Sequence, residues 1–299
     1  MNTTAKFRKC MWAIIKPLPF HIRYFITFVF TKRRIPHFFG RKDYSDYIFW
    51  DCFWGRHNKH AFLADKLAVR KYVEERGLGS TLTKIYGAWD NANKIDFEKL
   101  PNQFALKCNH SCGTNIICFD KTKLDIEATK RQLNEWLRMK HPVFHERHYF
   151  KIKPMIICEE LIPNNEDGFF PMDYKIHCAN GKPIFIQCCF ERNNEDVGRR
   201  VIYDTNWNNL HYILNDSHYS DEEVPKPKHL KEMLKCASIL SKGLDYARMD
   251  FYDTDTRVLF GEVTLTPMGG WMSYIKQEAL DIMGDAIRNG KKIKNERKF

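Results

Sequence analysis

The pattern of apolar and polar residues predicts both helices and strands along the chain. Segments whose apolar residues recur three and four positions apart, and which we expect to be helices, are 65–77, 125–139, 229–241 and 276–289. Short apolar runs that we expect to be strands are 104–107, 116–119, 155–162, 172–178, 183–190, 200–203, 246–252 and 258–265. Asn180-Gly181 is typical of a hairpin turn, so antiparallel pairing is expected around it.

Residues 11–30 are the one candidate membrane segment. Lys16, Arg23 and two prolines interrupt it, so its uncharged stretches are too short to cross about 30 Å of hydrocarbon. Apolar residues that nevertheless repeat at helical spacing are Ile15, Leu18, Ile22, Phe25, Ile26 and Val29. This stripe fits equally a helix lying on an anionic membrane surface and a helix packed on the protein's own body.

The net charge of +11 is concentrated at the two ends of the chain. Residues 1–42 hold ten Lys or Arg and no acid, and residues 288–299 hold six bases and one acid, which leaves the body slightly negative. Basic ends favour docking to lipid head groups, an acidic polymer or nucleic acid, although charges that are merely solvated give the same pattern. The 14% of aromatic residues exclude a disordered chain.

The ten cysteines are interpreted as free thiols of a reduced, cytosolic protein, because several lie in apolar strand-like runs and no leader cleavage site follows the first apolar segment. Cys108 and Cys112 lack the second ligand pair of a structural zinc site. His141, His145 and His148 have the spacing of one helix face, but Pro142 interrupts it. We expect these histidines in a loop that faces solvent or substrate.

A polar loop between two predicted strands is a candidate phosphate site. Lys107 precedes the segment NHSCGTN, whose small residues allow backbone N–H groups to approach phosphate oxygens. An ordinary hairpin loop has the same composition, and the P-loop pattern is absent.

Asp250 and Glu262 are a candidate magnesium pair, because each lies in an apolar strand and the two strands are joined by a short turn. Facing carboxylates repel unless a cation neutralises them, and Mg²⁺ binds one or two carboxylates together with nucleotide phosphates. Two acids that simply face solvent remain the alternative. The run from Ile157 to Ile162 could pack on adenine, and Lys175 is a second candidate phosphate lysine.

In their order along the chain, these motifs resemble the ATP-grasp superfamily and, more narrowly, its TupA-like (teichuronopeptide-biosynthesis) branch. The resemblance covers roughly residues 60–270 and rests on phrases such as DKLAVRKYV, LPNQFALKCNHSCGTNIIC, MDYKIHCANGKP and ARMDFYDTDTRVLFGEVTLTPMGG. It implies an α+β, ATP-grasp fold in which two lobes with antiparallel sheets clasp ATP, preceded by a short basic helical arm. The implied divisions are an arm at 1–60, a catalytic region at 61–290 with lobes at about 100–155 and 156–290, and a basic tail at 291–299.

The resemblance also implies roles for particular residues. The implied phosphate contacts and the loop that closes over them are Lys107, His110, Ser111, Gly113, Thr114 and Lys175. The implied adenine contacts are Glu159, Glu160 and Ile162, and the implied magnesium ligands are Asp250, Glu262 and Thr264. Arg248 would lie beside the transferred phosphoryl group and act in catalysis with Lys107 and Lys175. Thr264 stands where the family pattern has Asn, and its neutral hydroxyl is a poorer ligand.

The implied activity is ATP-dependent ligation of a carboxylate to an amine through an acyl phosphate. The expected substrates are a uronic acid of a capsule or O-antigen and an amino acid or other amine, with ATP and Mg²⁺ as cofactors. The expected location is cytoplasmic, peripheral on the inner face of the membrane through residues 1–42, and nucleic acid is not expected as a partner. The alternatives are a glycosyltransferase, for which Asp253 and Asp255 would be the metal motif, a kinase, and a non-enzymatic basic protein.

Overall fold

The computed structural model describes residues 14–162, 170–192, 198–214 and 223–296, with side chains up to residue 290. Its α-helices are α2 (Phe20–Lys32), α3 (Tyr44–Phe53), α4 (Ala61–Ala64), α5 (Val69–Glu75), α6 (Ile126–Arg138), α7 (Leu230–Ser241) and α8 (Gln277–Glu296). Its strands are β1 (Ile85–Trp89), β2 (Phe104–Cys108), β3 (Asn115–Cys118), β4 (Ile156–Glu159), β5 (Asp173–Ala179), β6 (Lys182–Phe190), β7 (Arg199–Tyr203), β8 (Ala247–Asp253) and β9 (Val258–Thr264). None of the described helices meets the length and hydropathy needed to cross a membrane.

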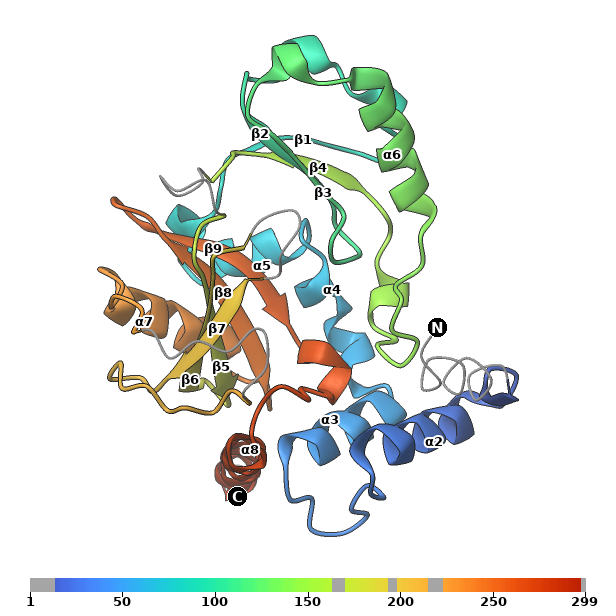
Figure 1. Cartoon of the computed structure of the whole chain (residues 1–299), viewed down its shortest axis with the longest axis vertical. Coiled ribbons are helices and arrows are strands. Elements are labelled where there is room, and N and C mark those ends of the chain that lie inside the picture. Colours follow the sequence, from blue (N-terminus) through green and yellow to red (C-terminus); the bar gives the residue numbers. More distant parts are fainter. Residues whose placement is uncertain (1–13, 163–169, 193–197, 215–222, 297–299) are drawn as a thin grey trace.

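The strands form two antiparallel sheets, one in the upper part of the molecule and the other below it, above helices α2, α3 and α8 (Figure 1). One has the order β1-β4-β2-β3 and the other the order β7-β6-β5-β8-β9. The predicted strands and their antiparallel pairing are confirmed, including the turn at Asn180-Gly181, where both residues have positive φ. The lobe boundary is corrected: β4 pairs with β1 and β2, so the change of sheet follows Glu159 rather than preceding Ile156.

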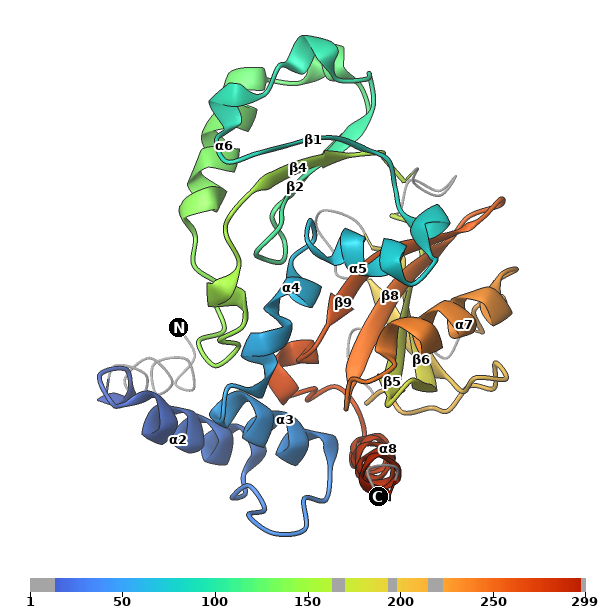
Figure 2. The ribbon, with the colours of Figure 1, turned by 180° about the vertical axis from the view of Figure 1, so that it is seen from behind.

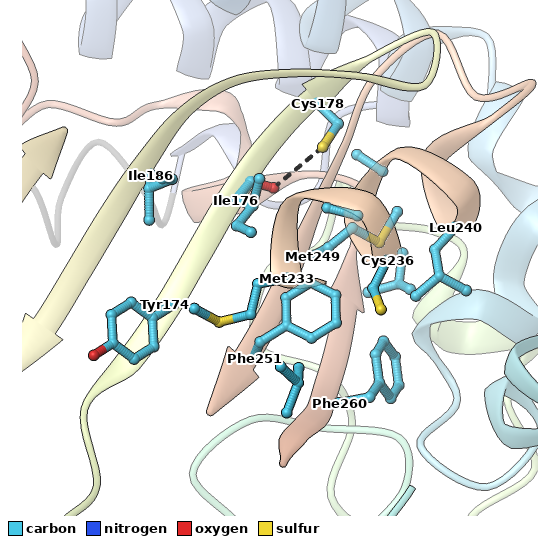
Figure 3. Close-up of a cluster of buried hydrophobic side chains, with 14 of the residues drawn as sticks. Tyr174, Ile176, Cys178, Ile186, Met233, Cys236, Leu240, Met249, Phe251 and Phe260 are labelled. Carbon is cyan, nitrogen blue, oxygen red and sulfur yellow. Dashed lines mark hydrogen bonds between the residues drawn. The ribbon is translucent and has the colours of Figure 1, made fainter. Parts of the chain in front are cut away.

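Helix α7 covers one face of the five-stranded sheet. Strand alternation turns Tyr174, Ile176 and Met249 toward α7, where Met233 and Leu240 complete a buried core (Figure 3). The same alternation places the residues between them, such as Lys175 on β5 and Asp250 on β8, on the opposite face. One face of this sheet is thus available for a site.

The four-stranded sheet is built in the same way, with α6 on its outer face. Leu106, Ile156 and Cys158 pack with Leu133 of α6 in a second buried core. Lys107 therefore projects from the opposite face, which is turned toward the five-stranded sheet.

A third core joins the two ends of the chain. Aromatic residues of α2 and α3 pack with Met283 and Ile287 of α8, and these three helices lie together below the five-stranded sheet (Figure 2). The predicted apolar stripe is right only in part: Ile15 is buried and Phe25 packs against this core, but the buried side chains of α2 are Tyr24 and Phe28, which the stripe did not include. Ile22, by contrast, is exposed. Residues 1–13 of the predicted arm and 297–299 of the predicted tail lie outside the described residues.

Candidate active site

A cavity of about 600 Å³ lies between the two sheets and is lined by residues of both. The predicted site residues that line it are Lys107, Ser111, Gly113, Thr114, Glu159, Glu160, Ile162, Lys175, Arg248, Asp250 and Glu262. Residues as far apart in the sequence as Lys107 and Glu262 are thus brought to one place because the two sheets face each other.

Two predicted site residues do not line the cavity. The ring of His110 is buried, and its Nε2 lies 3.2 Å from the carbonyl of Met139, so the loop turns this side chain away from the phosphate side. Thr264 lies behind the acidic pair, where its hydroxyl donates to Glu262 Oε1 at 3.0 Å and accepts from Arg248 Nη2 at 3.0 Å. Its position favours a role in orienting Glu262.

Asp250 and Glu262 lie directly opposite each other on β8 and β9, as predicted. Asp250 accepts from Arg248 Nε at 2.6 Å and from Lys175 Nζ at 2.6 Å. Burial disfavours the charge of Asp250, but Arg248 and Lys175 outweigh it and lower the pKa of this carboxyl to about 2. Burial likewise opposes the charge of Lys175, yet Asp173 and Asp250 raise its pKa above the ordinary value. Asp250 and Lys175 therefore hold each other in their charged forms.

Lys107 faces this group from the other sheet. Its ammonium donates to Glu159, whose second oxygen accepts from the hydroxyl of Thr83 at 2.8 Å. Burial disfavours both charges, but the attraction between them raises the pKa of Lys107 and lowers that of Glu159. Lys107 is thus held as a cation opposite the five-stranded sheet, which carries the cations Lys175 and Arg248. Together the three cations can neutralise a polyphosphate.

The acidic pair suits a hard cation only in combination with another ligand. Asp250 and Glu262 offer carboxylate oxygens, the donors that Mg²⁺ prefers. Among the described side chains, however, no cluster of three or more His, Cys, Asp or Glu could hold a metal by itself. The donor set therefore fits Mg²⁺ that shares its coordination with nucleotide phosphates and water.

The segment that follows β4 offers a place for a flat ring. Glu160 donates its backbone N–H to the carbonyl of Lys84 at 2.8 Å, which fixes this segment beside the cavity. Its carboxylate accepts from Arg257, in the turn that joins β8 and β9, at 3.2 Å. Apolar side chains that line the cavity nearby are Ala105, Ile117, Ile157, Ile162 and Phe260. Their apolar surfaces are suited to an aromatic base.

A strained turn at Pro267–Gly270 borders the cavity through Met268. Met268, Gly269 and Gly270 all have positive φ. Side chains from distant segments form hydrogen bonds with the carbonyls of this turn and of the residue after it. Tyr44 OH donates to Pro267 at 3.3 Å and Ser45 Oγ to Gly270 at 3.0 Å. His145 Nε2 lies 2.9 Å from the carbonyl of Gly269, and Lys32 Nζ donates to that of Trp271 at 3.2 Å. The N-terminal region thus fixes one wall of the cavity.

The three spaced histidines belong to this support and not to a solvated or substrate-facing loop. His141, His145 and His148 are buried. His141 Nε2 lies 2.5 Å from the carboxylate of Glu146, which also accepts from the hydroxyl of Thr266, and His145 stacks on Tyr24 of α2. The histidines do lie in a loop, as expected, but they are buried because the aromatic arm packs against this segment, which their spacing does not reveal.

Sequence reasoning missed several polar residues that line the cavity, among them Gln187, Arg192, Arg200 and Tyr274. The alternation along β6 could have placed Gln187 opposite Lys175, its partner in the sheet. The other three depend on the strand order and on the chain after the turn, for which the sequence has no local signal.

The acids of the alternative glycosyltransferase motif lie elsewhere. Asp253 accepts from His229 Nδ1 at 2.6 Å and from the backbone N–H of His229 at 3.2 Å, beside the start of α7. Asp255 lies in the turn that joins β8 and β9 and its carbonyl accepts from Lys228. Neither acid is among the residues that line the cavity.

Comparison with known proteins gives a family match and a set of structural likenesses. The family described as TupA-like ATPgrasp matches residues 46–288. D-alanine–D-alanine ligase from Bacillus anthracis, complexed with ATP, is 16% identical with a TM-score of 0.45, over 79% of this chain and 68% of that one. D-cycloserine synthetase DcsG is 12% identical with a TM-score of 0.42, over 76% and 70% of the two chains. No curated protein matches the sequence.

Proposed function

The chain belongs to the TupA-like ATP-grasp family. We propose that this ATP-grasp ligase joins a carboxylate to an amine and that the carboxylate is a uronic acid of a cell-surface polysaccharide. The observation that supports this proposal best is the convergence of Lys107, Lys175 and Arg248 with Asp250 and Glu262 in one cavity. Three cations and two acids suit a nucleotide triphosphate with its magnesium, and no nucleophilic side chain is required.

In this proposal ATP lies between the sheets, with adenine against Glu160 and Ile162 and the phosphates between Lys107 and Lys175. The loop from Ser111 to Thr114 covers the phosphates with backbone N–H groups. Asp250 and Glu262 would hold Mg²⁺, which neutralises phosphate charge when bound. Lys175 and Arg248, which now neutralise Asp250, would then be available to the phosphates.

The reaction balances without a group from the protein entering a covalent bond. A carboxylate oxygen of the substrate attacks the γ-phosphorus, the bond to the bridging oxygen breaks, and ADP leaves with an acyl phosphate formed. The amine then attacks the acyl carbon, phosphate leaves, and the amine loses a proton as the amide forms. Arg248 and Lys175 position the phosphoryl oxygens and stabilise their charge during transfer.

The arm supports the choice of a membrane-associated acidic glycan. Fourteen large apolar side chains are exposed among the described residues, and six of them lie between residues 14 and 39. These six, which we call the arm patch, are Ile14, Ile22, Phe30, Ile35, Phe38 and Phe39. The same stretch is rich in Lys and Arg. We propose that the arm patch rests on the anionic cytoplasmic leaflet, where it meets lipid-linked glycans.

Phosphate release tests the proposed activity. The full-length chain with ATP and Mg²⁺ is offered D-glucuronate or D-galacturonate, an amino acid or simple amine, or both together, and the products are weighed by mass spectrometry. We expect phosphate release and an amide mass only when acid and amine are both present. A phosphorylated hydroxyl compound would show a kinase, and transfer of a sugar from a nucleotide sugar would show a glycosyltransferase. Failure of ATP to bind in calorimetry with Mg²⁺ present would refute the nucleotide site itself.

A further inference from the structure

Arg200 differs from the other bases that line the cavity. Those bound to a carboxylate are Lys66, Lys107, Lys175, Arg192 and Arg248, and Arg70 donates to the carbonyl of Thr83. Within the described parts of the chain, Arg200 has neither a carboxylate nor a carbonyl partner. Its guanidinium carbon lies 4.7 Å from the centre of the Tyr274 ring, which holds the side chain in place while its N–H donors remain available.

Two further polar groups lie beside Arg200. On β6, Gln187 is only 2% exposed and shares its face of the sheet with Cys189, the direct partner of Arg200. The oxygen of Gln187 accepts from the Tyr274 hydroxyl at 3.0 Å, and its Nε2 donates to Cys189 Sγ at 3.3 Å. A thiol is a weak acceptor, so this amide can exchange it for a better one. Arg200 and Gln187 thus present donors to the same end of the cavity.

Arg200 lies farther from the proposed phosphate site than Gln187, which pairs directly with Lys175. Strands β6 and β5 lie between β7, which carries Arg200, and β8, which carries Asp250 and Arg248. Three strand spacings amount to about 14 Å between backbones. Burial raises the pKa of Tyr274, whereas the positive charges of Arg248 and Arg200 both oppose that rise, so the hydroxyl lies within the field of both guanidinium groups. Arg248, Tyr274 and Arg200 all line the same cavity, so a substrate that spans this distance can contact both arginines.

We propose that Arg200, together with Gln187 and Tyr274, binds a substrate carboxylate that is not the one being activated. The proposal rests on the proposed ligase function, because ATP and its magnesium would satisfy the other charged groups and leave this arginine for a different anion. A planar guanidinium with available donors matches a carboxylate in a bidentate pair. The carboxylate has two potential sources: the α-carboxylate of an amino acid that supplies the amine, or a neighbouring uronic acid unit of the glycan.

Ligand-observed NMR tests the subsite without knowledge of the natural substrate. The full-length protein loaded with Mg²⁺ and the non-hydrolysable analogue AMPPNP is mixed with alanine, alaninamide, galacturonate or the galacturonate dimer. Saturation transfer is compared in the wild type, in Arg200→Gln and in Arg199→Gln. Arg199 is a matched control, because it is the preceding residue of β7 and pairs with Glu191 instead of facing the cavity.

We expect Arg200→Gln, but not Arg199→Gln, to weaken binding of one carboxylate probe roughly tenfold or more, with AMPPNP affinity unchanged. If Arg200→Gln weakens the binding of alanine but not of alaninamide, the carboxylate belongs to the amine substrate. If it weakens the binding of the galacturonate dimer but not of galacturonate, the carboxylate belongs to the glycan. Equal signals in the two variants, or no carboxylate signal in a wild type that binds AMPPNP, would overturn the subsite. A wild type that fails to bind AMPPNP would instead refute the proposed function.

Discussion

At the scale of single residues, Asp250 is a buried carboxylate whose charge is fixed by two neighbouring cations. Arg248 and Lys175 both donate to it within 2.6 Å, in a position that is only 2% exposed. Removing either partner would leave a buried charge uncompensated, which is usually more harmful than losing the pair as a whole. Glu262 is more exposed and less tightly held, and is therefore the better residue for testing the acidic pair.

Replacing Glu262 with Gln should abolish most of the ATP turnover and leave the fold intact. The amide keeps the shape and the hydrogen bonds to Arg248 and Thr264 while removing the charge that we assign to magnesium binding. We expect a loss of about 10²-fold or more in magnesium-dependent phosphate release. Glu135→Gln, on the exposed side of α6, is the control and should be fully active. An active Glu262→Gln enzyme with unchanged magnesium dependence would place the metal elsewhere.

His148 should make stability depend on pH. Burial lowers the pKa of His148 to about 3, and the nearby His57 and His141 add to the effect. In the unfolded chain a histidine titrates near about 6.5, so below that pH the unfolded chain binds a proton that the folded protein does not. This group therefore reduces the free energy of unfolding as pH falls from about 6.5 to 3, by about 1.4 kcal/mol per pH unit.

Urea unfolding at a series of pH values measures this contribution of His148 to the free energy of unfolding. His148→Gln should flatten the dependence of the free energy of unfolding on pH by about one proton's contribution. His211→Gln, at an exposed position, should leave it as in the wild type. Equal slopes in the two variants would contradict the assignment.

At the scale of elements, the turn at Pro267–Gly270 depends on close packing against α3. A Cβ added to Gly270, where φ is +86°, would lie 2.7 Å from Cγ2 of the buried Ile48. Gly243 has a similar φ of +91°, but a Cβ there would meet nothing within 4 Å. The two glycines separate the cost of backbone strain from the cost of overpacking.

We expect Gly243→Ala to lower the free energy of unfolding by about 1 to 2 kcal/mol through strain alone. Gly270→Ala should add about 1 to 3 kcal/mol of overpacking and should also reduce phosphate release, because the turn borders the cavity. Chemical denaturation and the phosphate assay measure both effects. Equal losses of stability would mean that Ile48 moves aside at little cost.

The arm patch should bind anionic lipid through side chains that the core does not need. Phe39 and Ile35 are 95% and 61% exposed, whereas Tyr24 and Phe28 of the same arm are buried. Deletion of residues 1–42 would remove the buried as well as the exposed apolar side chains and would uncover the core. Point substitutions are therefore the sharper test. Ile35→Glu with Phe39→Glu should reduce binding to anionic vesicles roughly tenfold or more without loss of stability.

Co-sedimentation with anionic and neutral vesicles, at low and high salt, provides the measurement. Phe119→Glu, an exposed phenylalanine at the end of β3, is the control and should bind like the wild type. A wild-type protein that ignores anionic vesicles would refute membrane docking, and α2 would then serve the core alone.

At the scale of the whole molecule, the sequence predicted the elements whose apolar residues stand out from their neighbours. Strands β2 to β9 are short apolar runs, and helix α7 has apolar residues at helical spacing. Helix α3 was not predicted, because nine of its ten residues are buried and no polar face remains. Strand β1 was missed because its five residues are all half-buried.

The residues of the site also fall into a group that the sequence could bring together and a group that it could not. Asp250 and Glu262 could be paired from the sequence, because a short turn fixes which residues of a hairpin face each other. Arg200 and Tyr274 could not, since their meeting depends on a sheet order that runs β7-β6-β5-β8-β9 and on the path of the chain after the turn. Long-range order of this kind has no counterpart in a local pattern.

The core shared by the two ends of the chain sets the order in which the protein can fold during synthesis. Tyr24, Phe28 and Phe49 are buried against a cluster that includes Leu280 and Met283, more than two hundred residues later. At about 5 to 20 residues per second, a ribosome takes roughly 10 to 50 s to make that distance. Throughout this time the aromatic arm lacks the part of its core that α8 supplies, so we expect it to stay accessible to protease and to chaperones until the last helix leaves the exit tunnel.

Ribosome-arrested chains of increasing length provide the test. Cleavage within the arm by a brief pulse of protease should persist in chains that end before α8 has emerged and should fall sharply once it has. Protection of the arm in chains that end at residue 250 would mean that α2 and α3 find a stable place without the C-terminal helix.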